Sequence, residues 1–239
     1  MQMRRARSIL REIVFPLHCA LCSSSLLSQG LVVYGLCPAC LRLFARDPSP
    51  RCRSCGRPLL AEDGLCMRCR QYEEVPLLGL CRALFCYAGP ASLLMRAWKF
   101  GKHRVLARFI AHSFARELAL LPKELLWRDL IIVPAPSSPG RLKRCAWDQM
   151  ALVARELSSL TGLPLSSCLV RGHSQSQKTL DRQGREANLR GKIHCKRQPP
   201  RRALLIDDVV TTGATLRSCE RALFDGGSLE VYCLVFCYD

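Results

Sequence analysis

The second half of the chain alternates short apolar runs with longer amphipathic stretches. The clearest apolar runs are "DLIIVPAP" at 129–136, "ALLIDDVV" at 203–210 and "LEVYCLVFCY" at 229–238, and they indicate buried strands. The stretches with helical spacing are residues 92–121 with a break near Gly101, residues 148–162, and residues 215–227, and the last two end at glycine. Strands separated by crossover helices predict an α/β fold, with a mostly parallel sheet flanked by helices.

Cysteine spacing, rather than apolar periodicity, organises the first part of the chain. Four CxxC pairs occur in "CALC", "CPAC", "CRSC" and "CMRC", among glycine and proline turn signals. Two residues between cysteines let one tight turn direct both sulfurs at a single ion, and two such turns complete a tetrahedron. We therefore predict two structural zinc ions, with eight ligands: Cys19, Cys22, Cys37, Cys40, Cys52, Cys55, Cys66 and Cys69.

The spacing leaves open how the four pairs combine. Sequential pairing would join the first two pairs around one ion and the last two around the other, whereas interleaved pairing is also compatible with the spacing. A thioredoxin-type redox motif is disfavoured, because such a motif occurs once, between a strand and a helix. The other eight cysteines lack ligand spacing and are predicted to be small apolar filler: Cys81, Cys86, Cys145, Cys168, Cys195, Cys219, Cys233 and Cys237.

Composition places the chain among globular proteins. Its 239 residues are 49% hydrophobic, which is enough for a packed core. The most apolar region, residues 75–95, is interrupted by Pro76, Arg82 and Pro90, so no membrane-spanning helix is expected. The basic amino terminus lacks the apolar stretch of a signal peptide, and we expect a cytoplasmic protein with reduced thiols. The domains predicted are a zinc-ribbon domain at 1–76 and an α/β domain at 77–239.

Two loops at expected strand ends carry unusual polar groups, at 134–140 and 207–215. In parallel sheets ligands bind at the carboxyl ends of the strands. We expect Asp207 and Asp208 to emerge where a strand at 203–206 ends, because adjacent carboxylates are costly to bury. The "TTGAT" that follows offers hydroxyls and main-chain amides at a helix amino terminus, which suits a phosphate. The order fits a ribose 5-phosphate; no P-loop or GxGxxG motif is present, and an ordinary threonine N-cap is the plainer alternative.

These motifs resemble a known family. "LLIDDVVTTGAT" is similar to the phosphoribosyl pyrophosphate (PRPP) signature of type I phosphoribosyltransferases. The whole chain resembles the ComF family (ComFC/GntX-like), whose members join a double zinc ribbon to such a domain. The likeness rests on the cysteine quartets, that signature, and the segments "AWKFGKHRVLA", "VPAPSSPGRLKR" and "QKTLDRQGREANLRG".

The resemblance implies roles for matched residues. Asp207 and Asp208 would be the catalytic pair that holds the ribose hydroxyls, and Pro136 and Ser137 would face the pyrophosphate. The PRPP-binding loop would comprise Val209, Val210, Thr211, Thr212, Gly213, Ala214 and Thr215. A mobile segment over the site would carry Gln177, Leu180, Arg185 and Asn188, with Arg185 contacting the ligand.

One departure affects the implied activity. Where the family usually has R-G-F-N-Q, this chain has Cys145, Ala146, Trp147, Asp148 and Gln149, so catalysis is less secure than binding. The implied reaction is displacement of pyrophosphate from ribose C1, with magnesium neutralising the leaving group. No histidine is assigned as a general base; the candidates are His103, His112, His173 and His194.

Charge adds a second hypothesis. The chain has 36 Lys and Arg against 19 Asp and Glu, a net charge of +17, which attracts polyanions. Basic clusters occur at 4–7, 141–144 and 196–202, and Trp98, Phe100 and Trp147 lie among basic residues, where they either stack on bases or belong to the core. ComF-like proteins are associated with natural transformation, so the resemblance implies single-stranded DNA and other DNA-uptake proteins as partners. The chain is therefore either a DNA-uptake protein with a PRPP site or a phosphoribosyltransferase with an unidentified acceptor.

Overall fold

The structure is a computed structural model, which describes residues 18–26, 34–45, 47–53, 55–59, 64–71, 81–101, 103–120, 129–138, 140, 147–172 and 192–239. Several residues of the sequence analysis lie outside these ranges. They are the basic residues at 4–7 and 141–144, Cys145, Ala146, His173, and the segment with Gln177, Leu180, Arg185 and Asn188.

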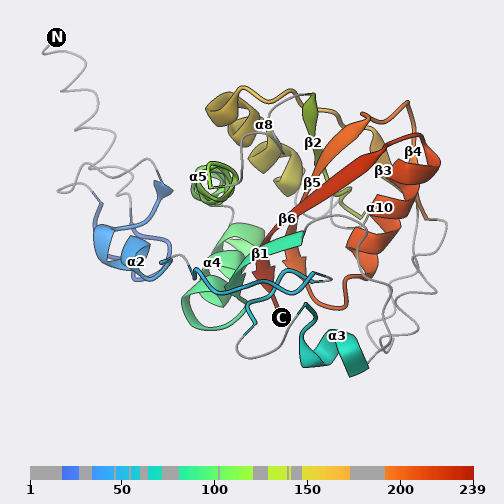
Figure 1. Ribbon diagram of the computed structural model, residues 1–239. Coiled ribbons are helices and arrows are strands. Elements are labelled where there is room, and N and C mark those ends of the chain that lie inside the picture. Colours follow the sequence, from blue (N-terminus) through green and yellow to red (C-terminus); the bar gives the residue numbers. More distant parts are fainter. Residues whose placement is uncertain are drawn as a thin grey trace, which may run out of the picture. The chain divides into compact units, whose positions relative to one another are not determined.

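A four-stranded parallel sheet forms the centre of the larger compact unit. Its strands are β1 (Cys81–Cys86), β6 (Glu230–Tyr238), β5 (Arg202–Val210) and β2 (Leu130–Pro134), in the order β1-β6-β5-β2. All three pairings are parallel. The predicted α/β class with a mostly parallel sheet is therefore confirmed (Figure 1).

Two helices cover the sheet on opposite sides (Figure 1). Helix α10 (Ala214–Asp225) packs on β5 and β6, and α8 (Gln149–Thr161) packs on β2 and β5. Both follow the sequence prediction, and α8 ends at Gly162 with a left-handed φ of 73°, because glycine adopts that conformation at little cost. The helices α4 (Gly89–Phe100) and α5 (Leu106–Leu118) flank the break predicted near Gly101.

A small antiparallel sheet was not predicted. It pairs β3 (Leu169–Arg171) with β4 (Ile193–Cys195), and it packs with α10 over one face of the main sheet. The core on that face includes Leu205 from β5, Val231 from β6 and Leu223 from α10, all at most 1% exposed. Three-residue strands leave too short a pattern for sequence periodicity to detect.

The cysteines outside the CxxC pairs mostly behave as apolar filler. Cys81, Cys168, Cys219, Cys233 and Cys237 are at most 1% exposed, as expected for small core side chains. Cys86, at the end of β1, is exposed, and for this residue the prediction was wrong. Cys195 is half-buried.

The chain forms two compact units. One comprises Met1–Ala45 and Ala88–Phe109, and the other Arg46–Tyr87 and Ile110–Asp239. The first contains α2 (Pro38–Arg42) and α4, and the second contains α3 (Met67–Gln71) and the sheet. The domain boundary between residues 76 and 77 stays a prediction.

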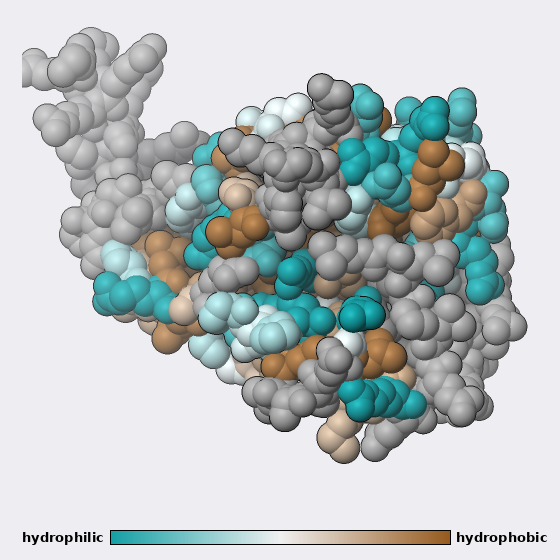
Figure 2. Space-filling model, viewed as in Figure 1, coloured by the Kyte–Doolittle hydropathy of each residue, from teal (hydrophilic) through white to brown (hydrophobic). Residues whose placement is uncertain are grey.

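Most apolar side chains are buried, and a few reach the surface. On the face shown in Figure 2, hydrophobic residues appear in separate groups among hydrophilic ones. Isolated exposed apolar residues are ordinary in folded proteins, but Phe100, at the end of α4, is 79% exposed. None of the helices in the described ranges has the length and apolar character needed to cross a membrane.

Candidate functional site

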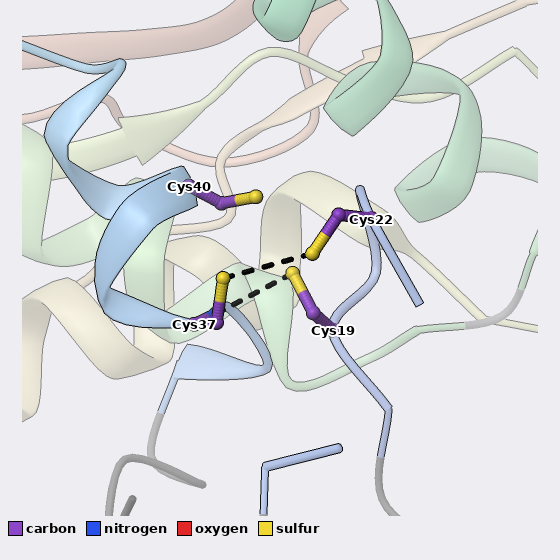
Figure 3. Close-up of side chains that lie close together, drawn as sticks. All are labelled: Cys19, Cys22, Cys37 and Cys40. Atoms are coloured by element: carbon purple, nitrogen blue, oxygen red, sulfur yellow. Dashed lines mark hydrogen bonds between the residues drawn. The ribbon is translucent and has the colours of Figure 1, made fainter. Parts of the chain in front are cut away.

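The eight paired cysteines form two zinc-binding sites with four sulfur ligands each. In one cluster Cys19, Cys22, Cys37 and Cys40 direct their sulfurs toward a common centre (Figure 3). The other cluster comprises Cys52, Cys55, Cys66 and Cys69, and within each cluster the four sulfurs lie within 4.8 Å of one another. The pairing is thus sequential, and the interleaved alternative is wrong. Four sulfur ligands suit a closed, structural zinc site.

The two clusters are built on the same main-chain turn. In the first, the N–H of Ser23 donates to the carbonyl of Cys19, and in the second the N–H of Gly56 donates to the carbonyl of Cys52, both at 2.9 Å. Ser23 and Gly56 each follow a CxxC pair, and both have a left-handed backbone, with φ of 60° and 72°. The repeat therefore extends beyond the cysteines to the turn that orients them.

Main-chain hydrogen bonds to sulfur are also repeated. The N–H of Cys37 donates to the sulfur of Cys19, and the N–H of Cys66 donates to the sulfur of Cys52, both at 3.4 Å (Figure 3 shows the first). Hydrogen bonds of this kind favour the charged thiolate, which is the form that binds zinc. The donor set and its main-chain partners therefore fit the metal.

The thiols of the first cluster differ in pKa. The hydrogen bond with the Ser24 hydroxyl lowers the pKa of Cys22 to about 6. Burial raises the pKa of the Cys40 thiol above its ordinary value. Adjacent thiolates repel, and a divalent cation among them is what allows all four to ionise together.

The second cluster is attached to the edge of the main sheet at β1. The N–H of Ala83 donates to the carbonyl of Gly56 at 3.2 Å, and Arg51 donates to the carbonyl of Ala83 at 2.8 Å. A Cβ on Gly56 would lie 2.6 Å from the Ala83 nitrogen, so only glycine permits this approach. The glycine of "CRSCG" is the sequence feature that could have indicated this contact with Ala83.

The carboxylates Asp207 and Asp208 lie within β5, not at its end. The expectation that the strand would end at Ile206 was wrong, whereas the apolar run at 203–210 matches the observed strand: β5 continues to Val210, which pairs with Tyr238 of β6. Pairing with β2, however, stops at Pro134 opposite Ile206. Both aspartates therefore lie beyond the carboxyl end of β2. Ligands of parallel sheets bind at this edge of the sheet, as the sequence analysis expects.

The two carboxylates have different surroundings. Asp208 is buried, with 5% of its surface exposed, whereas Asp207 is half-buried. The side chain of Asp207 accepts the N–H of Asp208 at 2.8 Å, which fixes the orientation of its carboxylate. Carboxylate oxygens in such positions can accept hydrogen bonds from the hydroxyls of a ligand.

The loop from Thr211 to Gly213 leads directly into α10. Gly213 occupies the N-cap position with a left-handed φ of 77°, and the Thr212 hydroxyl before it accepts the N–H of Ala214, the first residue of the helix, at 3.4 Å. Arg217, one turn into the helix, donates to the carbonyl of Thr212 at 2.9 Å. Its guanidinium lies 2.7 Å from where a Cβ on Gly213 would be. The loop thus combines a helix amino terminus with a cation, which suits an anion.

Asp148, where the family usually has asparagine, bonds to the loop after β2. Asp148 is the N-cap of α8 and accepts the N–H of Ala151 at 3.1 Å. The Ser137 hydroxyl donates to the same carboxylate oxygen at 3.2 Å. Asp148 therefore positions the loop that contains Pro136 and Ser137, a role that asparagine or aspartate can fill at an N-cap.

Sequence reasoning missed Arg217 and the bond between Ser137 and Asp148. The available signals were an arginine one turn after "TTGAT" and an N-cap residue before an amphipathic helix.

The aromatic and histidine candidates differ in exposure. Trp98 is fully buried, Trp147 is half-buried and Phe100 is exposed. The interpretation as core therefore holds for Trp98 and fails for Phe100. His103 and His194 are exposed, and His112 is half-buried in α5.

Comparison with known proteins covers both parts of the chain. A family model described as "Double zinc ribbon domain" matches residues 10–70. The chain is 27% identical over 232 residues to competence protein F of Haemophilus influenzae, which covers 91% of this chain and 95% of that protein. The competence protein ComFC of Streptococcus pneumoniae is 26% identical over 196 residues, covering 82% of this chain and 84% of that protein.

The chain therefore resembles the ComF family over most of its length, in agreement with the resemblance found in its sequence motifs. A further relative is the DNA utilization protein YhgH of Escherichia coli O157:H7, with 27% identity over 247 residues, 93% of this chain and 98% of that protein. A solved structure, a glutamine PRPP amidotransferase from B. subtilis, matches with a TM-score of 0.36 and 20% identity, covering 54% of this chain and 25% of that chain.

The contact between Gly56 and β1 can be tested by substitution. Gly56→Ala is expected to lower the free energy of unfolding by about 2 kcal/mol or more, because a left-handed L-residue costs about 1–2 kcal/mol and the added Cβ meets main chain. Ser23→Ala, at the equivalent turn position, exchanges one L-residue for another at an exposed site and is expected to change it by less than about 0.5 kcal/mol. Thermal unfolding of both zinc-loaded variants is the measurement, and equal shifts would contradict the contact.

Proposed function

We propose that this protein binds PRPP with magnesium at the carboxyl edge of its parallel sheet and acts on single-stranded DNA during DNA uptake. The observation that carries the proposal is the position of Asp207 and Asp208 beyond the end of β2, immediately before a glycine-containing loop at the amino terminus of α10. A family relationship to proteins named for competence and DNA utilization supports the DNA role.

The PRPP site would use the charges of the loop in two ways. The carboxylates of Asp207 and Asp208 accept hydrogen bonds from the ribose hydroxyls, and the segment Val209–Thr215 donates to the 5-phosphate. Arg217 adds a positive charge beside that phosphate, and Ser137 lies on the loop proposed to face the pyrophosphate. Magnesium, when bound, neutralises the pyrophosphate and so eases its departure from ribose C1.

The two forms of the proposal differ in the molecule that accepts the phosphoribosyl group. A DNA-uptake protein would release pyrophosphate only when single-stranded DNA is present, or would bind PRPP without releasing it. A phosphoribosyltransferase that serves metabolism would release pyrophosphate with a small acceptor and no DNA. Following pyrophosphate in samples with and without oligonucleotide separates the two.

A single-stranded DNA surface is supported by the charge and exposure of α4. Residues 75–116 contain no Asp or Glu but seven Lys and Arg. Leu93, Arg96 and Phe100 are exposed and spaced along one face of α4. An exposed aromatic ring beside arginine provides a stacking platform with a cation for the phosphates. Reduced thiols for zinc and a DNA partner also fit the expected cytoplasmic location.

The carboxylate pair can be tested by isosteric substitution. Asp207→Asn and Asp208→Asn are each expected to weaken PRPP–magnesium binding at least about tenfold, because each removes a charged hydrogen-bond acceptor. Asp225→Asn, at the far end of α10, is the matched control and should leave the affinity unchanged. Isothermal titration gives the affinities, and wild-type binding that survives both site substitutions would contradict the proposed site.

The aromatic platform makes a separate prediction. Phe100→Ala is expected to lower affinity for a labelled oligo-dT by about 1–3 kcal/mol, the usual cost of losing one base stack. The exposed position means that stability should hardly change. Leu160→Ala removes another exposed apolar side chain and is the control. Fluorescence anisotropy at two salt concentrations is the measurement, and an unchanged affinity would exclude α4 as the stacking surface.

A further inference from the structure

We infer that the second cysteine cluster, with Cys52, Cys55, Cys66 and Cys69, positions the PRPP loop through Arg57 and Asp239. Ligand affinity would then depend on zinc at this cluster and not at the first. The inference rests on the proposed PRPP site and adds a regulatory connection to it. All the residues in the connection belong to one compact unit, which comprises Arg46–Tyr87 and Ile110–Asp239.

The first link joins a zinc ligand to Arg57. The N–H of Cys52 donates to the carbonyl of Arg57 at 2.9 Å, and the N–H of Gly56 donates to the carbonyl of Cys52 at 2.9 Å. Arg57 therefore closes the turn that aims Cys52 and Cys55 at the ion. Its main-chain position depends on the turn's being closed around the metal.

The second link joins Arg57 to the end of β6. The Arg57 guanidinium donates to the main-chain carbonyl of Asp239. The same guanidinium lies 5.4 Å from the centre of the Tyr238 ring, within cation–π distance. A charged side chain from the zinc-bound turn thus holds the last two residues of the chain on the sheet.

The third link reaches the loop. The N–H of Asp239 donates to the carbonyl of Val210 at 3.0 Å, and Tyr238 is the β6 partner of Val210. The carbonyl of Tyr238 also accepts the N–H of Tyr87 at 2.7 Å. Val210 is the last residue of β5, and Thr211 follows it directly. Hence the point where the PRPP loop leaves the sheet is fixed by residues that Arg57 holds.

A second attachment acts in parallel at β1. Gly56 and Arg51 bond to both main-chain groups of Ala83, and β1 pairs with β6 on its other side. The zinc-bound turn therefore supports the sheet edge as well as its end. Loss of the metal would release both supports together and lower the fraction of molecules with a formed loop, which weakens apparent affinity by that fraction.

Arg57 is a positioning residue, and its substitution is the first test of the link from the zinc-bound turn to the PRPP loop. Arg57→Ala is expected to weaken PRPP–magnesium binding about fivefold to tenfold, with both zinc ions retained. Arg57→Lys, which keeps a donor and a charge, should recover part of the loss. Arg53→Ala changes an exposed arginine on the same turn, whose side chain lies against Gly64, and should leave affinity within about twofold.

Cysteine substitutions provide the second test, with one variant in each cluster. Cys55→Ser and Cys22→Ser each replace one ligand and should reduce the zinc content from two ions to one per chain. PRPP affinity should fall in Cys55→Ser and stay close to wild type in Cys22→Ser. Equal losses in the two variants would overturn the inference, because they would indicate a general effect of zinc on folding.

Hydrogen exchange separates failure of the inference from failure of the proposed function. Without PRPP, Arg57→Ala should speed exchange in peptides that cover Val209–Thr215 and Val235–Asp239, whereas Arg53→Ala should not. If wild-type protein binds no PRPP, the proposed function fails, yet faster exchange in Arg57→Ala would still support the link from the zinc-bound turn to the loop. Unchanged exchange and unchanged affinity in Arg57→Ala, with both ions bound, would overturn it.

Discussion

Strand β5 is longer than its neighbour β2, and the candidate ligand site depends on this difference. Pairing between them stops at Pro134 opposite Ile206, and the last hydrogen bond comes from the Ala135 N–H to Ile206 at 2.9 Å. Because β5 goes on paired with β6, Asp207 and Asp208 lie in a strand whose β2 side has no further strand pairing within the described ranges.

Much of this arrangement could be predicted from the sequence, because zinc spacing, helix caps and apolar runs are local signals. The eight zinc ligands and the strand and helix around Asp207 were found in this way. The apolar run at 203–210 also predicted the end of β5 at Val210, but the position of Asp207 and Asp208 inside the strand was not expected, because the cost of burying adjacent carboxylates favours a strand end. The β3–β4 pair and the contact of Gly56 with Ala83 are tertiary, and no local pattern encodes them.

The contacts of Asp148 explain part of the departure from the family pattern at residues 145–149. An aspartate at 148 still caps α8 and still holds Ser137, so the geometry of the loop after β2 does not need asparagine there. What changes is charge, because a carboxylate now lies under the loop proposed to face pyrophosphate. A negative group in that position would make binding of the anion depend more strongly on magnesium.

The two zinc turns have the same main-chain hydrogen bonds but differ at the residue in the left-handed position, and this difference separates their roles. Ser23 occupies the left-handed position of the first turn and is exposed, so this turn needs only to hold its ion. Gly56 occupies it in the second, where any Cβ would meet Ala83. Glycine lowers the stability of the isolated turn through its conformational freedom. Its use is therefore explained by the contact with β1, which attaches the second cysteine cluster to the edge of the sheet that contains Asp207 and Asp208.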